Sequence, residues 1–188
     1  MNYLESDLEA LAVAAEIIHP RVGRWTYETW AELNENLWDG ELPICGIQWG
    51  LTPHGSAHGL WSGSQNTITL HKSLIEPKGN AWGIAHKMGE RYAADVLLHE
   101  MMHQYIDVVL GVRDGGESES PSKSSHNNPY WVAEVNRIAQ LLGLDCKAQV
   151  VKQRRVNGRV KWAPRDGAMT MSELGSFPHC VRPGSHYV

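Results

Sequence analysis

Two histidines and a glutamate, His99, Glu100 and His103, form the pattern His-Glu-x-x-His. Residues four apart lie on one face of a helix, so the two imidazoles can share one metal ion. Imidazole nitrogens bind zinc at about 2.0–2.1 Å, usually in tetrahedral sites. Glu100 lies about 100° further round the helix, beside the expected metal, where a carboxylate can take a proton from water. The pattern predicts a zinc site with an adjacent general base.

The alternative is a chance match in a helix whose histidines make ordinary hydrogen bonds. Apolar residues surround the motif on almost every side, which is typical of a buried helix. They are Val96, Leu97, Leu98, Met101, Met102, Ile106, Val108, Val109 and Leu110. Burying the motif and Asp107 among them is costly unless these groups are paired or bind metal. Gly111 then supplies a left-handed helix end. The flanks therefore favour zinc.

A third ligand is expected further along the chain. Asn128 followed by Pro129 predicts the start of a helix that runs to about Leu142. His126 lies just before this start, at a rigid corner, and is the expected third ligand; an exposed loop histidine is the alternative. Glu134 borders the apolar stripe of this helix. It is the rival ligand, or a residue that hydrogen-bonds a ligand histidine.

Composition restricts the class of protein. The chain has 188 residues, 42% hydrophobic and 20% charged, which favours one soluble domain with a small appendage. Its net charge of −4 leaves only a local basic patch to serve nucleic acid. Three distant cysteines without Cys-x-x-Cys argue against disulfides and a zinc ribbon. An acidic N-terminus and the lack of a long apolar run predict a cytoplasmic protein without a membrane span.

The remaining pattern predicts a small sheet preceded by helices. The expected helices are 7–18 and 26–38, and the expected strands are 44–49, 58–61 and 66–71. In the last strand, Ile68 and Leu70 should face inward. The outward face of Thr67–His71 could pair with an extended substrate if this strand is an edge. His54 and His58, in a glycine-rich loop, are interpreted as surface histidines.

A basic segment follows the expected metal site. Residues 147–165 hold seven basic side chains and no acidic one. Asn157-Gly158 predicts a two-residue hairpin turn that pairs Arg154 with Lys161. Alternation then gives one face four basic residues, which are Lys152, Arg154, Arg159 and Lys161. This face is either ordinary solvated surface or a patch that contacts DNA phosphates.

Four segments carry a resemblance to a known family. They are 33–43, with an aromatic-Asp-Gly-x-Leu-Pro turn; 68–70, Ile-Thr-Leu; 98–103, Leu-His-Glu-Met-Met-His; and 125–131, Ser-His-Asn-Asn-Pro-Tyr-Trp. Across residues 26–143 this combination resembles the SprT-like family, the bacterial relatives of the Spartan DNA–protein crosslink protease. The resemblance implies a zincin-like α+β domain, three histidine ligands, a catalytic glutamate and peptide hydrolysis. The chain departs from it by lacking a four-cysteine zinc ribbon and by a longer loop between His103 and His126.

The sequence thus predicts an α+β, zincin-like fold, with a small sheet on the helix that carries His-Glu-x-x-His and a C-terminal hairpin appendage. The expected parts are an N-terminal helix in 1–25, the zincin domain in 26–143, and the hairpin and tail in 144–188. The predicted activity is zinc-dependent peptide hydrolysis with one zinc per chain, on protein substrates that include DNA-associated ones. Tyr130 is a candidate for stabilising the oxyanion. The alternatives are a DNA-associated module with a structural zinc, or a zinc hydrolase of non-peptide bonds.

Overall fold

A computed structural model describes residues 3–52, 57–75, 90–112, 129–142, 153–156 and 159–162. The chain divides into two compact units, Met1–Gly111 and Val112–Val188. This division falls elsewhere than the domain boundaries expected after residues 25 and 143. The first unit combines helices with a three-stranded sheet, and the second contains a helix and a hairpin. The fold is mixed α+β, as the sequence predicts.

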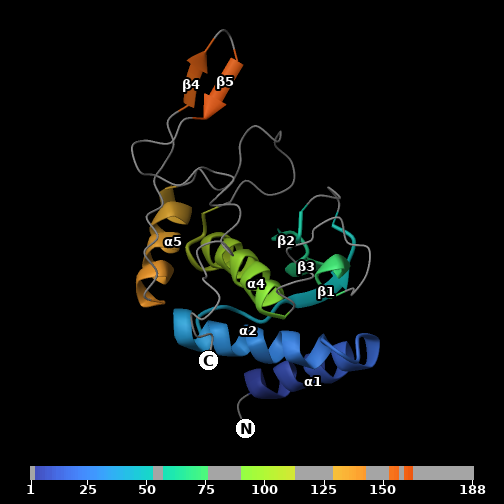
Figure 1. Cartoon of the computed structure of the whole chain (residues 1–188). Helices are drawn as coiled ribbons and strands as arrows, with labels where there is room; N and C mark the ends of the chain where they lie inside the picture. The colour runs from blue at the N-terminus through green and yellow to red at the C-terminus, as the bar shows by residue number, and fades with distance from the viewer. Residues whose placement is uncertain are drawn as a thin grey trace. The chain divides into compact units, whose positions relative to one another are not determined.

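The first two helices pack against each other. Helix α1 (Tyr3–Ile18) and helix α2 (Gly23–Trp38) lie side by side (Figure 1), and both begin about three residues before their expected starts. The predicted stripe of α2, which is Trp30, Leu33 and Leu37, is buried. Asp39 and Gly40 end the helix with φ of 51° and 74°, as their left-handed preference predicts. Ile18, the last residue of α1, is 70% exposed.

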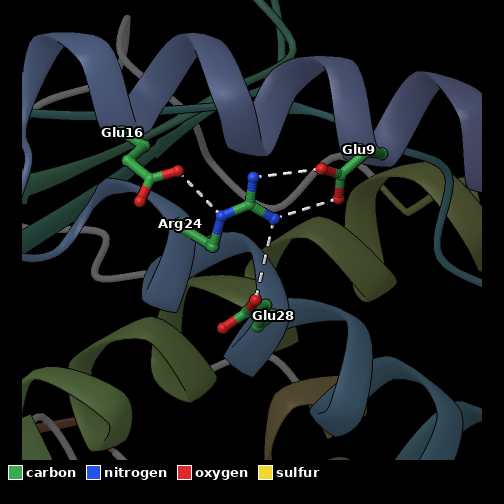
Figure 2. Close-up of polar contacts among 4 residues, drawn as sticks. All are labelled: Glu9, Glu16, Arg24 and Glu28. Atoms are coloured by element: carbon green, nitrogen blue, oxygen red, sulfur yellow. Dashed lines mark hydrogen bonds and ion pairs between the residues drawn. The ribbon is translucent and has the colours of Figure 1, made fainter.

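Arg24 joins the two helices (Figure 2). Its guanidinium donates to both carboxylate oxygens of Glu9 at 3.0 Å and, through Nε, to Glu16 at 2.8 Å. Glu28, one turn further along α2, lies 3.9 Å from Nη1. The hydrogen bond from Arg24 lowers the pKa of Glu9. These groups are largely solvated, so the cluster fixes the geometry of the helix pair more than it stabilises the fold.

The sheet has the order β1-β3-β2, with β1 (Gly46–Gly50) parallel and β2 (Gly59–Ser62) antiparallel to β3 (Thr67–His71). Ile68 and Leu70 are completely buried, as predicted. Thr69, expected to face outward, is also buried, and its hydroxyl accepts a hydrogen bond from Gln48 at 2.8 Å. The central position of β3 rules out the expected pairing of substrate with its edge, because both of its sides are already occupied by strands.

Helix α4 (Glu90–Gln104) carries the His-Glu-x-x-His motif. It contacts α2 and the strands β2 and β3, and every residue from 93 to 104 is buried. The chain then continues as a π-helical turn, η2 (Tyr105–Val109), which the sequence pattern did not predict. Gly111 has φ +63°, as expected of a left-handed helix end. The prediction of a buried helix holds for α4, whereas Val108 and Leu110 beyond it are exposed.

The second unit contains helix α5 (Pro129–Leu141) and a hairpin of β4 (Gln153–Val156) and β5 (Arg159–Trp162). Trp131, Val135 and Ile138 are fully buried, whereas Leu142, the fourth residue of the expected stripe, is only partly buried. The hairpin has the predicted register, in which Arg154 pairs with Lys161. The loop expected before His126 lies outside the described residues. Among the described helices, none is long and apolar enough to cross a membrane.

Candidate metal centre

The two histidines of the motif converge at their Nε2 atoms. His99 and His103, one turn apart on α4, have these atoms 3.3 Å from each other and ring planes inclined at 71°. A tetrahedral ion with bonds of about 2.0–2.1 Å separates two of its ligand atoms by roughly 3.3–3.4 Å. Both side chains are buried, with 8% and 9% of their surface exposed. The pair therefore has the spacing that two zinc ligands require.

Two ligands do not make a complete site. The described residues contain no cluster of three or more His, Cys, Asp or Glu side chains able to hold a metal ion. His126, the expected third ligand, lies outside those residues. An Nε2–H of one ring donating to Nε2 of the other would also fit the 3.3 Å separation. The geometry of His99 and His103 thus fits two zinc ligands, and the third ligand stays a prediction.

Glu100 is buried beside the histidines, with 6% of its surface exposed. Strand β2 runs directly against it at Gly59. A Cβ atom on Gly59 would lie 2.5 Å from Glu100 Oε1, 2.7 Å from its Cγ and 2.8 Å from a methyl carbon of Val96. Real Cβ atoms do not approach other atoms so closely, so this position requires glycine for the observed Glu100 conformation.

Gln104 follows the second histidine and holds the end of α4. It is fully buried, and its Oε1 accepts from the indole of Trp30 at 3.3 Å while its Nε2 donates to the carbonyl of Pro43 at 2.7 Å. The thiol of Cys45 also lies 3.8 Å from Oε1. Burial raises the pKa of that thiol to about 12, so it stays protonated at neutral pH. Sequence reasoning missed Gln104, although one amide inside an apolar helix is a signal for a buried hydrogen-bonded group.

Asp107, which the sequence places among apolar residues, has a hydrogen-bond partner. Its Oδ2 accepts a hydrogen bond from the indole of Trp61, on β2, at 3.0 Å. Strand β2 thus contacts helix α4 and its π-helical extension at two places, Gly59 against Glu100 and Trp61 against Asp107. Because these residues are two apart on a strand, both lie on the face of β2 that is directed at the helix.

Glu134, the rival third ligand, already accepts hydrogen bonds within the second unit. Both carboxylate oxygens of Glu134 accept hydrogen bonds from Arg137, at 3.0 Å to Nε and 2.6 Å to Nη2. Glu134 is buried, and this two-point contact with a guanidinium is a strong one. Tyr130, the oxyanion candidate, has 52% of its surface exposed. Neither observation makes these residues part of the site.

His58 is more buried than a surface histidine. Its backbone carbonyl accepts from the amide of His71 at 2.7 Å, directly across the strand pair. Burial lowers the pKa of His58, and the charge of His71 lowers it further. Nδ1 of His71 accepts from the backbone amide of Ser73 at 3.2 Å. The interpretation of His58 as a surface residue is therefore wrong; His54 lies outside the described residues.

For the basic hairpin, the structure describes the backbone pairing of the two strands. Arg154 pairs with Lys161, and Val156 pairs with Arg159, as predicted. Lys152 lies outside the described residues. The common basic face of the four side chains stays a prediction.

Comparison of the chain with protein-family models, with curated proteins and with solved structures found no match.

Proposed function

We propose that the protein is a zinc metallopeptidase of the SprT-like, zincin type. The observation that carries the proposal is the 3.3 Å separation of His99 Nε2 and His103 Nε2 on a buried helix, with Glu100 beside them. A carboxylate placed to act as a general base beside two converging imidazoles serves hydrolysis, whereas a structural site does not need a general base. The motif and its geometry therefore favour catalysis.

The residues divide the work as follows. His99, His103 and a third ligand hold the ion. Bound zinc supplies a Lewis acid that polarises a carbonyl and acidifies water. Glu100 accepts a proton from the attacking water and later gives it to the departing amine. Tyr130 is retained only as a candidate donor to the oxyanion.

His126 is the proposed third ligand. Glu134 is the less suitable of the two, because Arg137 already occupies both of its carboxylate oxygens. Using Glu134 as a ligand would take its carboxylate away from this two-point contact with Arg137, which is a strong one. A neutral imidazole at residue 126 carries no such cost.

The substrate backbone is proposed to pair with β2 in place of β3. Within the described strands, β2 pairs on one side only, with β3, and it lies against Glu100 through Gly59. An extended peptide added to such an edge gains backbone hydrogen bonds and is aligned along the site. This mode fits an unfolded or extended polypeptide better than a compact small molecule.

DNA-associated proteins are the proposed substrate class if the hairpin binds DNA. The observation in its favour is the register that sets Arg154 opposite Lys161 in a chain of negative net charge. Like charges opposed across a hairpin are mildly destabilising, and an anionic partner would compensate.

The test uses the full chain, with metal content and hydrolysis of an unfolded protein measured for the same preparations. The wild type should contain one zinc and hydrolyse the substrate; His99→Ala and His103→Ala should lose both properties. Glu100→Gln should keep zinc and lose hydrolysis by roughly a hundredfold or more. Loss of zinc in Glu134→Ala but not in His126→Ala would reverse the ligand assignment.

The same measurements separate the alternatives. A wild type that binds zinc but does not hydrolyse protein, with or without DNA, is a structural zinc module or a hydrolase of other bonds. Hydrolysis of non-peptide esters or amides that Glu100→Gln abolishes would identify the latter. Turnover of protein substrate that is unchanged in Glu100→Gln would remove Glu100 from the mechanism.

A further inference from the structure

Strand β2 approaches Glu100, the proposed general base, so closely at position 59 that only glycine fits there. The Cα of Gly59 faces Glu100 so that an added Cβ would lie 2.5 Å from Oε1 and 2.7 Å from Cγ. The same Cβ would lie 2.8 Å from Val96, one turn earlier on α4. The backbone of Gly59 therefore occupies the space on one side of the Glu100 carboxylate.

This approach cannot be relieved simply by moving the strand. Gly59 is paired with Leu70 in the register of β2 and β3, and Leu70 is completely buried. Two residues further along, Trp61 donates to Asp107 at 3.0 Å and ties β2 to the turn that follows α4. A larger residue at position 59 would therefore displace the far end of the Glu100 side chain, which is the softest group in the contact.

We propose that Gly59 is a positioning residue for Glu100: its lack of a side chain determines where the carboxylate lies beside the histidine pair. The catalytic role of Gly59 rests on the proposed function, whereas the close approach of Gly59 to Glu100 does not depend on it. Proton transfer needs the base within about 2.6–3.2 Å of its partner, so a shift of the carboxylate by even part of an ångström impairs it.

The first test is independent of activity and uses thermal unfolding of the full chain. Gly59→Ala should lower Tm, because its methyl group meets Glu100 and Val96. In a Glu100→Ala background the Cγ and carboxylate are gone, so the same substitution should lower Tm by less than half as much. Gly50→Ala, on the same sheet at a site with open space around its Cα, controls for adding a methyl group to a strand. Equal Tm losses from Gly59→Ala in both backgrounds would overturn the proposal.

The second test concerns catalysis. Gly59→Ala should keep its zinc and its KM for an unfolded protein substrate, lose tenfold or more in kcat, and change the acid limb of the pH profile. Combining it with Glu100→Gln should cause no further loss beyond Glu100→Gln alone, because both substitutions act on one group. Gly50→Ala should retain wild-type kcat. A Gly59→Ala variant with wild-type kcat and pH profile would refute the positioning role.

The two tests distinguish the two proposals. If the wild type binds no zinc or hydrolyses nothing, the proposed function fails, while the Tm comparison still decides whether Gly59 sets the position of Glu100. If hydrolysis and its dependence on Glu100 are found but the Tm losses are equal and kcat is unchanged, the function stands and the positioning role of Gly59 falls.

Discussion

At the residue scale, the spacing of residues along the chain predicted the histidine pair of the site but not the residues that pack around it. The interval of four between His99 and His103 predicted that their rings share a helix face, and the 3.3 Å approach of their Nε2 atoms agrees with that. The contact of Gly59 with Glu100 joins residues 41 positions apart in the chain. No local pattern specifies such a contact, because it depends on how the sheet packs on the helix.

Gln104, next to the histidine pair, provides a stability prediction. Gln104→Met preserves the approximate volume but leaves the buried indole N–H of Trp30 without this acceptor and removes the donor to the carbonyl of Pro43. The stranded indole N–H costs about 1–3 kcal/mol, so the free energy of unfolding from urea titration should fall by about that amount. Gln48→Met is the matched control, because Gln48 is exposed and makes one side-chain hydrogen bond, to Thr69. Equal losses in both variants would show that burial of the amide does not decide the cost.

At the element scale, the sequence predicted which segments are helices and strands but not how they are joined in space. Alternation in residues 66–71 predicted a strand with Ile68 and Leu70 inside, which is correct. Its central place between a parallel and an antiparallel neighbour was not predictable, because period-2 patterning is silent about strand order. The π-helical turn after Gln104 was likewise not predicted, since both helix types use the same apolar residues.

The hairpin offers the opposite case, where a short-range turn signal fixed the register. Asn157-Gly158 predicted the pairing of Arg154 with Lys161, three residues to either side of the turn, and the strands have that register. Turn chemistry succeeds here because hairpin pairing is local, whereas the strand order of the main sheet is not.

DNA binding by this hairpin is testable through its salt dependence. Four phosphate contacts, from Lys152, Arg154, Arg159 and Lys161, should give a log–log slope of affinity against salt of about −3 to −4. Fluorescence anisotropy with labelled DNA at several salt concentrations measures this slope. Changing all four residues to Gln should weaken binding at low salt and flatten the slope. A wild type that does not bind, or a variant with the same affinity and slope, would leave the hairpin as solvated surface.

At the scale of the whole molecule, the sequence pattern predicted the mixed α+β class correctly. The chain divides into two compact units, Met1–Gly111 and Val112–Val188, at a boundary that composition does not indicate. Unit boundaries depend on where long-range packing is sparse, which residue frequencies do not record. The polar segment 113–125, which the sequence predicts to be a loop, lies outside the described residues.

Stability as a function of pH is a property of the whole fold, and the half-buried His58 contributes to it with a defined sign. The pKa of His58 lies below its ordinary value of 6.5, first because burial disfavours the imidazolium and second because His71 adds positive charge nearby. Below pH 6.5 the unfolded chain therefore binds a proton that the folded chain resists. The free energy of unfolding must fall as pH decreases through 6.5, and this contribution to the loss ends below the folded pKa.

His58→Gln removes this linkage and keeps a polar side chain of similar length. Urea titrations of the wild type and the variant from pH 7.5 down to pH 5 measure it. At pH 7.5 the histidine is neutral in both states, so the difference between the two proteins reflects only packing and hydrogen bonding. Towards pH 5 the wild type should lose more stability than the variant, by about 1.4 kcal/mol for each unit of pKa depression that the pH range spans. A difference that stays constant with pH would mean that His58 titrates equally in both states, and a difference that grows in the opposite direction would mean that the folded protein favours its imidazolium.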